Sequence, residues 1–442
     1  SWVHWSRGTQ PSPGNQTFEL WPDVREYTNT HATAYANLAN GQPAKLFSSY
    51  SESTIQLHMK WIRDYGIDTV ALQRFGSEFN DPAAKSENDK MAELVRNPAE
   101  NFERKFYIQY DISGWNDFAE KIKTDWTSTI ISSLKLTSSP AYAKHQGKPI
   151  VCIWGIGFSD HPGDATQSLA VINWFKSQGV YVIGGVPTYW RNSINDSKAA
   201  FQDVYKAYDM VQPWLVGRIT NLASSDQMVA NVVKYDLAYA KKIGVDYVPV
   251  IFPGFAWSNW NGGAPNMIPR LHGDFMWRQA FNLKTADALH GVYVAMFDEY
   301  DEATAIAKAA EDKAKAEQIG VKPNSPDQLS DTVVKEAPKE VLVAHVQVDK
   351  PGVENGGIEF FGTKSAPQVV GEDGKLTPPA PPPGSGLPIP PDAITTSDTF
   401  IGQPGGTSFN SPDIAVPVLT TYVCKTQIKD GKEIPSTLIK KI

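Results

Sequence analysis

The chain has 442 residues, 41% of them hydrophobic, and its 41 basic and 48 acidic residues give a net charge of −7. A chain of this length can bury a large core, either in one α/β barrel or in two or three smaller domains. The absence of a basic stripe argues against nucleic acid as a ligand, and no run of ~18 apolar residues predicts a membrane span.

The distribution of aromatic residues divides the chain into two parts. The last of thirteen tryptophans is Trp277, the one tyrosine after residue 330 is Tyr422, and the run from Pro378 to Pro391 is rich in proline. We therefore expect residues 1–320 to form a globular body and residues 321–442 to be a linker with a small, β-rich or extended C-terminal segment. Alanine, lysine and glutamate are frequent from about Glu302 to Gln318, which predicts a helix at the junction.

Two features bear on the cellular compartment. The chain begins with Ser1 and not with methionine, so we predict a secreted or periplasmic protein whose leader has been removed. Cys152 lies within an apolar run, where a small core residue is expected, and a bridge to Cys424 is the alternative. Two cysteines do not form a disulfide scaffold, and they leave the redox compartment open.

In chain order, a helix is predicted from Ser53 to Tyr65, with Ile55, Met59 and Ile62 on one face. Runs rich in β-branched and aromatic residues follow, separated by amphipathic stretches. The predicted strands are Thr69–Phe75, Phe106–Ser113, Pro149–Phe158, Tyr181–Tyr189, Met210–Val216, Tyr247–Phe255 and Gly291–Phe297. Gly66, Gly179 and Gly244 each lie shortly before one of these strands, as expected of glycines that end helices.

Apolar strands that alternate with helices predict an α/β fold whose parallel sheet is covered on both faces. The predicted strands nearly complete a ring, so we predict a (β/α)8 TIM barrel. The region before Thr69 is loop-like, aromatic and polar. We expect the first strand of the barrel to be either missing from the sequence or irregular.

The active site of such a barrel lies at the carboxyl ends of its strands. Tryptophan, arginine and acidic residues are frequent there; indole rings stack on sugars, and charged groups hydrogen-bond hydroxyls. The alternative is that the tryptophans only fill the space between helices and barrel. The predicted substrate-binding residues are Arg74, Asp111, Trp154, Tyr189, Trp190, Arg191, Trp214, Arg218, Trp257, Asp298 and Asp301.

The most informative segment is the run of acids Asp298-Glu299-Tyr300-Asp301-Glu302 at the end of the last predicted strand. Crowded carboxylates raise one another's pKa, so that one can hold a proton while its neighbour is ionised. Cleavage of a glycosidic bond needs such a pair, one acid and one base or nucleophile. A solvated charged loop and a divalent-cation site are the alternatives.

Other catalytic chemistry finds little support. His4, His58 and His272 are isolated in the sequence, and each is interpreted as a hydrogen-bonded structural residue. No nucleophile elbow or phosphate-binding loop is present, and Gly155-Ile-Gly157 lacks the third glycine of a dinucleotide site. We predict no cofactor and no metal.

Motifs in conserved order and spacing over most of residues 1–310 resemble the glycoside hydrolase family 71/99-like proteins, which are related to the family 99 endo-α-mannosidases. They are Leu20–Val24, Tyr50–Thr54, His58–Trp61, Tyr65–Asp68, Gln73–Phe75, Tyr110–Gly114, Gly147–Pro149, Trp154–Phe158, Gly185–Arg191, Pro213–Arg218, Pro253–Trp257 and Met296–Ile306. In the mannosidases the last motif is typically Asn-Glu-x-x-Glu-Gly-Thr, and its two catalytic glutamates fall on Glu299 and Glu302.

The resemblance implies that Glu299 is the base for the 2-hydroxyl next to the scissile bond, which gives a 1,2-anhydro sugar and retention. It implies that Glu302 is the general acid and later the base. This chain departs from the family pattern with Asp298 for asparagine, Asp301 for histidine, Ala303 for glycine, and Asp111 near the place of a strand-end glutamate.

We therefore predict a glycoside hydrolase that cleaves an α-linked polysaccharide or glycan with retention. One alternative is a barrel that binds carbohydrate without cleaving it. Another is a structural or assembly protein whose proline-rich tail binds a partner that the sequence does not identify.

Overall fold

The computed structural model describes residues 2, 4–38, 41–286 and 291–310, and the backbone of four short strands further on. Its α-helices are α1 (Glu52–Asp64), α2 (Pro82–Asn101), α3 (Phe118–Thr124), α4 (Ala165–Ser177), α5 (Gln202–Ala207), α6 (Leu222–Met228), α7 (Lys234–Ile243), α8 (Ser258–Asn261) and α9 (Asp274–Thr285). Its strands are β1 (Thr30–Ala32), β2 (Lys45–Phe47), β3 (Thr69–Phe75), β4 (Lys105–Asp111), β5 (Lys144–His145), β6 (Lys148–Trp154), β7 (Tyr181–Val186), β8 (Met210–Pro213), β9 (Asp246–Tyr247), β10 (Val250–Ile251), β11 (Tyr293–Val294), β12 (Val369–Val370), β13 (Leu376–Thr377), β14 (Gln427–Lys429) and β15 (Lys432–Ile434).

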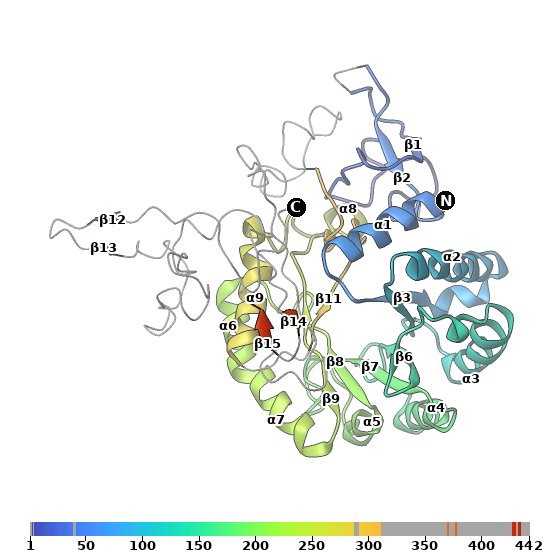
Figure 1. The fold of residues 1–442 in the computed structure, drawn as a ribbon, viewed down its shortest axis with the longest axis vertical. Coiled ribbons are helices and arrows are strands. Elements are labelled where there is room, and N and C mark those ends of the chain that lie inside the picture. Colours follow the sequence, from blue (N-terminus) through green and yellow to red (C-terminus); the bar gives the residue numbers. More distant parts are fainter. Residues whose placement is uncertain are drawn as a thin grey trace.

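A parallel sheet with the strand order β3-β4-β6-β7-β8-β9 forms the centre of the molecule, and β5 pairs with β6 at its side. Strands β10 and β11 form a separate parallel pair. Figure 1 shows helices α2 to α7 in an arc outside these strands. The prediction of an α/β fold with a parallel sheet is confirmed, and β3 has the predicted bounds. The strand pairs of the described residues do not close a ring, so the closed barrel stays a prediction.

Burial follows from the composition of the strands. All six residues of β7 are buried, as are the six residues of β4 after Lys105. A strand covered on both faces cannot alternate between polar and apolar residues, which explains the continuous apolar runs in the sequence. The packing partner of β7 is α4, whose Val171, Ile172 and Phe175 are all 0% exposed.

The helix ends agree with the glycine positions. Gly66 follows α1, Gly179 follows α4 and Gly244 caps α7, with φ angles of +74°, +74° and +71°. Residues with a Cβ rarely adopt this left-handed conformation, so glycine is favoured at each of these turns.

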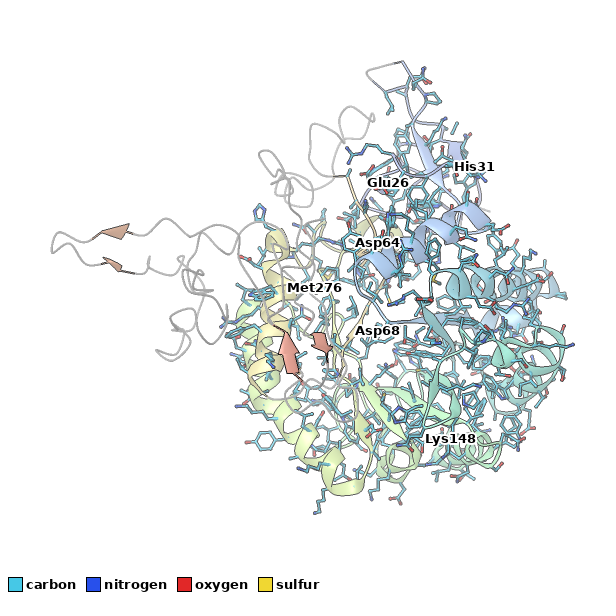
Figure 2. All side chains as sticks on the ribbon, viewed as in Figure 1. Glu26, His31, Asp64, Asp68, Lys148 and Met276 are labelled. Carbon is cyan, nitrogen blue, oxygen red and sulfur yellow. The ribbon has the colours of Figure 1, made fainter. Side chains whose placement is uncertain are left out.

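The region before β3 forms a second apolar core. Strands β1 and β2 pair with each other in antiparallel orientation and not with the parallel sheet. Trp5, Phe18, Trp21 and Phe47 are buried together with Tyr300, which is 0% exposed. Figure 2 shows Glu26 and His31 of this region near α1 and its last residue, Asp64. The described residues before Thr69 therefore lack a regular strand of the central sheet, as expected for an irregular start.

The helix predicted from Glu302 to Gln318 is wrong for residues 302–310, which form turns and extended backbone. Helix propensity is overridden there by tertiary contacts. The amide of Ala305 donates to the Glu299 carbonyl and that of Ala307 to the Phe297 carbonyl, at 3.0 and 2.8 Å. The amide of Ala310 donates to the carbonyl of Trp21 in the N-terminal region.

Beyond residue 310, β12 pairs with β13 and β14 pairs with β15, each pair antiparallel. The rest of the predicted segment 321–442, including the proline-rich run, lies outside the described residues, so its boundary and its partner stay predictions. None of the helices in the described part of the chain is long and apolar enough to cross a membrane.

Candidate active site

The four acids lie on a loop of residues 296–306, here called the acidic loop, which directly follows β11. The loop is closed by its own backbone, since the Ile306 amide donates to the Met296 carbonyl at 3.0 Å. Arg270 donates from Nη2 to the carbonyls of Ala303 and Ala305, at 2.9 and 2.5 Å. These contacts hold the loop in a single conformation, so its side chains have defined directions.

The four acidic side chains differ in exposure. The side chain of Asp298 is 44% exposed and that of Asp301 is 7% exposed, whereas Glu299 and Glu302 are half-buried. Nδ1 of His4 lies 2.9 Å from Oδ2 of Asp301. A carboxylate oxygen of Glu299 lies within 4.8 Å of these two groups. Three residues thus bring polar atoms to one point, although His4 is 297 positions away from Asp301 in the sequence.

Burial sets the electrostatics of the two glutamates. Desolvation, together with the charge of Asp301, raises the pKa of Glu302 to about 7. Desolvation also raises the pKa of Glu299 well above its ordinary value, with a second contribution from the charge of Glu302. The positive charge of His4 opposes both shifts. One of the two glutamates can therefore hold a proton at neutral pH, as predicted for crowded acids.

Two histidines that were interpreted as isolated structural residues border the acidic loop. Desolvation lowers the pKa of His4, but the hydrogen bond to Asp301 and the surrounding negative charges outweigh it and raise the pKa to about 9. His58 behaves in the opposite way, since burial lowers its pKa to about 4 despite Asp298 nearby. His58 hydrogen-bonds the Tyr27 hydroxyl at 2.7 Å. At neutral pH the loop thus faces one charged and one neutral imidazole.

Asp111 at the end of β4 belongs to the same end of the sheet. Its carboxylate accepts hydrogen bonds from Gln73 Nε2 at 2.9 Å and from the Ser113 amide at 2.8 Å. Burial nevertheless raises the pKa of Asp111. The hydroxyl of Tyr293 accepts from Gln109 at 3.3 Å, and the charges of Glu299 and Asp111 both contribute to raising the pKa of Tyr293, after burial as the main cause. Tyr293 therefore lies near both carboxylates.

Aromatic rings form a continuous row beside these carboxylates. Trp154 contacts Trp214 edge-on with ring centres 5.2 Å apart, and the rings of Trp214 and Tyr293 are 6.5 Å apart. Gly185 makes room for this arrangement, because a Cβ there would lie 2.2 Å from Cδ1 of Trp154. Trp154 and Trp214 are half-buried, so each ring retains exposed surface.

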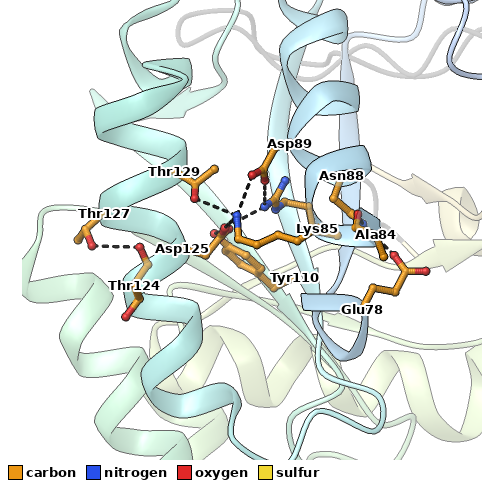
Figure 3. A network of polar contacts seen from close by, with 11 residues as sticks. Glu78, Ala84, Lys85, Asn88, Asp89, Tyr110, Thr124, Asp125, Thr127 and Thr129 are labelled. Carbon is orange, nitrogen blue, oxygen red and sulfur yellow. Dashed lines mark hydrogen bonds and ion pairs between the residues drawn. The ribbon is translucent and has the colours of Figure 1, made fainter. Parts of the chain in front are cut away.

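Arg74 requires a correction, because the structure buries its side chain in an ion-pair network. Its side chain is 1% exposed, and Nη2 donates to Asp89 and Asp125 at 2.7 and 2.9 Å. Figure 3 shows the network around it, in which Tyr110 and Lys85 also contact Asp125. Residues alternate along a strand, and Arg74 follows the inward-facing Gln73, so its side chain points to the helices outside the sheet.

Trp190 also requires a correction. It is 0% exposed, and its indole nitrogen donates to Asp236 of α7 at 2.9 Å. Arg191 pairs with the other oxygen of Asp236 at 2.8 Å. Both residues lie four or more positions beyond the end of β7, in a loop that turns towards the outer helices. They fix this loop to α7, and Trp190 has no surface left for a sugar.

The structure does not join the other three predicted binding residues to the acidic loop through any contact among the described residues. Arg218 is exposed and pairs with Asp196 at 3.3 Å, and the backbone of Tyr189 donates to the same aspartate. Trp257 is half-buried and packs on Phe255, with ring centres 5.0 Å apart. Their role in substrate binding stays a prediction.

Sequence reasoning missed four residues of the site: His4, Arg270, Tyr293 and His161. His161 hydrogen-bonds Ser113 at 2.9 Å and packs edge-on against Trp154. Tyr293 lies inside a predicted strand and could have been found from its inward register. The other three lie in irregular segments, where no periodicity indicates which side chains meet.

Cys152 is 0% exposed in the interior of the sheet, with Sγ 3.8 Å from Gln212 Oε1, and it carries a free thiol. Its interpretation as a core residue agrees with this position. Cys424 lies outside the described residues, so a bridge stays untested.

The group formed by His4, Glu299 and Asp301 has the donor types and the spacing that a divalent cation accepts, which keeps the alternative of a cation site open.

Comparisons with known proteins complete the description. Neither the protein-family models nor the curated proteins contain a match. Among solved structures, the chain is similar to a GH99 endo-alpha-mannosidase of Bacteroides thetaiotaomicron in complex with BIS-TRIS-propane, with 14% identity, a TM-score of 0.48, and coverage of 67% of this chain and 80% of that one. A second structure of the GH99 endo-alpha-mannosidase from that organism has 16% identity, a TM-score of 0.45 and coverage of 68% and 84%. A structure described as a glycoside hydrolase-like protein has 14% identity, a TM-score of 0.46 and coverage of 67% and 92%. TM-scores below 0.5 carry no weight for the function of this chain.

Proposed function

We propose that the protein is a glycoside hydrolase that cleaves an α-linked polysaccharide or glycan with retention. The observation that carries this proposal is the pair Glu299 and Glu302, two half-buried carboxyl groups with raised pKa values on one fixed loop. Glycosidic cleavage needs one protonated and one ionised carboxyl group on either side of the bond. The row formed by Trp154, Trp214 and Tyr293 offers the flat apolar surface on which a sugar ring packs.

Glu302 is the general acid in this proposal. With a pKa of about 7 it is about half protonated at neutral pH, and it can donate that proton to the departing glycosidic oxygen. The resulting carboxylate then accepts a proton from the attacking water in the second step. The transition state at the anomeric carbon is positively charged in character, and the negative charge of Asp301 beside Glu302 favours it.

Glu299 is the base. Burial and the charge of Glu302 raise the pKa of Glu299 well above its ordinary value, and the protonated imidazole of His4, within 4.8 Å, opposes this shift and favours the ionised form that a base needs. The ionised carboxylate removes the proton of the neighbouring 2-hydroxyl, whose oxygen attacks the anomeric carbon as the glycosidic bond breaks. Water, which loses a proton to Glu302, then opens the 1,2-anhydro sugar while Glu299 returns its proton to the 2-oxygen. This gives overall retention, as the motif resemblance of residues 296–306 implies.

We infer that this site stands at the open end of a (β/α)8-type frame. The support is the contact of Gln109 on β4 with Tyr293 on β11, two strands that are not neighbours in the described pairing. Such a contact across the interior is expected where strands curve towards one another.

The experiment is a screen of plant, fungal and algal polysaccharides for release of reducing sugars, followed by kinetics of three variants on the best substrate. We expect Glu299→Gln and Glu302→Gln each to reduce kcat far more than tenfold, because each removes a proton-transfer group. Glu120→Gln is the matched control, since the Glu120 side chain is 84% exposed on α3 and should leave kcat unchanged. A Glu299 variant within a factor of two of the wild type would refute the assignment.

A barrel that binds carbohydrate without cleaving it is the second candidate, because the aromatic row serves binding as well as catalysis. Isothermal titration of the wild type and of Glu302→Gln with α-mannan fragments separates the two. If Glu302→Gln still binds the glycan but no longer releases product, the protein is an enzyme. Binding by both proteins without release from any glycan in the screen indicates a lectin-like protein.

A further inference from the structure

One concave surface of the described residues is lined by no residue of the acidic loop. A cavity of about 400 Å³ opens between the N-terminal region and the segment around α8. It is lined by Arg7, Gly14, Asn15, Gln16 and Ser258–Gly262. We call it the α8 pocket. No carboxylate is among the residues that line it.

The walls of the α8 pocket are joined by polar contacts. Glu19 is 4% exposed, and its carboxylate accepts hydrogen bonds from the amide and the hydroxyl of Ser258, and from the Asn266 amide at 3.0 Å. Asn259 donates to the Phe18 carbonyl at 2.7 Å, and Arg7 donates to the Trp260 carbonyl. A buried carboxylate that ties two distant segments together keeps the pocket formed without a ligand, which lowers the cost of binding.

The chemistry of the lining suits a hydroxyl-rich ring. Asparagine and glutamine side chains can donate and accept at the same time, as sugar hydroxyls require. Those of Asn15, Gln16 and Asn259 also hydrogen-bond Thr9, Tyr35 and Phe18 within the protein, which fixes the direction of each side chain. Trp260 is 41% exposed, whereas the other tryptophans of the described residues are buried or half-buried, and an exposed indole is a platform for the apolar face of a sugar. The volume is that of a small-molecule site.

We propose that the α8 pocket is a second carbohydrate-binding site, which holds one or two residues of an oligosaccharide by stacking on Trp260 and by hydrogen bonds to the surrounding amides. It contains no pair of carboxyl groups and therefore binds without cleaving. The segment around α8 is attached to the acidic loop, since the Ala256 amide donates to the Glu302 carbonyl at 2.9 Å. A long glycan held at this pocket is kept close to the acidic loop.

The test measures binding directly, so it does not depend on hydrolysis. The full chain carrying Glu302→Gln is screened on an array of defined neutral oligosaccharides, and the strongest are titrated calorimetrically. We expect two sites, one of which loses roughly tenfold or more in affinity in the double variant with Trp260→Ala, because a stacking platform is removed. Asn261→Leu, an exposed change in the same lining, should weaken the same site, whereas Trp260→Phe should retain most of the affinity.

Tyr235→Ala is the matched control, since Tyr235 is an aromatic residue that is 59% exposed on α7, outside the pocket lining. Asn15 begins a sequon, so the protein is produced in a host that does not attach N-glycans. Equal binding by the Trp260→Ala and Tyr235→Ala proteins, both folded by thermal melting, overturns the proposal, as does an array without any bound oligosaccharide. If the screen for hydrolysis fails but Trp260-dependent binding is found, the pocket stands and only the proposed catalysis falls.

Discussion

At the scale of residues, the site is governed by how much water reaches each acid. Asp298 projects into solvent, whereas Glu302 is half-buried two peptide units beyond Tyr300, which is itself 0% exposed. Burial penalises the charged form of a carboxyl group, and an adjacent charge such as that of Asp301 adds to the penalty. Burial thereby raises the pKa values of Glu299 and Glu302 above those of free carboxyl groups.

The first prediction concerns the pH dependence of kcat/KM. Because Glu302 must be protonated to act as the acid, activity should fall as the pH rises above about 7, the pKa of this group. Asp301→Asn removes a charge that raises this pKa, so the decrease of kcat/KM with rising pH should begin at lower pH than in the wild type. If kcat/KM of Asp301→Asn decreases at the same pH as in the wild type or at higher pH, the assignment of Glu302 is contradicted.

The second prediction concerns Ala303, which has a φ of +53° in the acidic loop. The left-handed conformation costs an L-residue about 1 kcal/mol, and the resemblance places a glycine at this position. Ala303→Gly should therefore increase the free energy of unfolding by about 0.5 to 1 kcal/mol, less the entropy that glycine gains in the unfolded chain. Ala305→Gly, in the same loop at a position without positive φ, should destabilise; stabilisation by both changes in chemical denaturation would exclude this explanation.

At the scale of elements, the carboxyl end of β3 is fixed from outside by the Arg74 network. Arg74 on β3 pairs with Asp89 on α2 and with Asp125, the first residue of the π-helical segment Asp125–Ser133. Tyr110 of β4 donates to the same aspartate at 2.8 Å. Four elements thus meet at one buried ion pair. The network holds Gln73, the neighbour of Arg74, in the register that lets it reach Asp111.

The third prediction follows from this network. Arg74→Ala removes the positive charge that compensates the buried negative charge of Asp125. The free energy of unfolding should therefore decrease by about 3 to 5 kcal/mol. Lys90→Ala, which removes an exposed pair with Glu93, should change stability by less than about 1 kcal/mol. The two are compared by urea denaturation. Because Arg74 does not contact substrate, Arg74→Lys should keep the KM of the wild type wherever it folds, and a KM raised more than tenfold would restore Arg74 to the binding site.

At the scale of the whole molecule, the N-terminal region packs against the acidic loop. Its aromatic core contains Tyr300, and Asp23 joins residue 308 through the backbone at 2.9 Å. His4 reaches Asp301 across 297 positions of sequence. The first thirty residues therefore support the structure of the acidic loop, and we expect substitutions in them to change the catalytic rate.

The fourth prediction is the pH dependence of folding that His4 contributes. Its pKa is about 9 in the folded protein against an ordinary value of 6.5, so the folded state binds the proton more tightly. The resulting stabilisation is complete below pH 6.5 and is lost as the pH rises through about 9. The His4 side chain is 44% exposed, so solvent screening limits the effect to about 1 kcal/mol or less.

The measurement compares thermal unfolding of the wild type and of His4→Gln from pH 6 to 10. The difference in stability between them should shrink across this range. His31→Gln removes an exposed histidine from the same region and serves as the control. A constant difference between wild type and His4→Gln at all pH values contradicts the predicted linkage.

The sequence by itself determined the order and type of the main elements and indicated the acidic run as the candidate catalytic segment. Strands such as β3 and the glycine stops at Gly66 and Gly244 could be predicted because apolar periodicity and left-handed turns are local properties. The acidic run was conspicuous for the same reason, since its residues are adjacent. The strands followed in the expected order from these local signals, except that the predicted strand Tyr247–Phe255 is divided into β9 and β10.

Only the tertiary structure decided which side chains meet. Arg74 and Trp190 stand at strand ends as substrate-binding residues would, yet they turn outward into buried ion pairs and hydrogen bonds. His4 and Arg270 lie in irregular segments and are brought to the acidic loop by contacts that no periodicity encodes. The physical reason is that long-range contacts depend on how whole layers pack, whereas propensity and pattern extend over only a few residues.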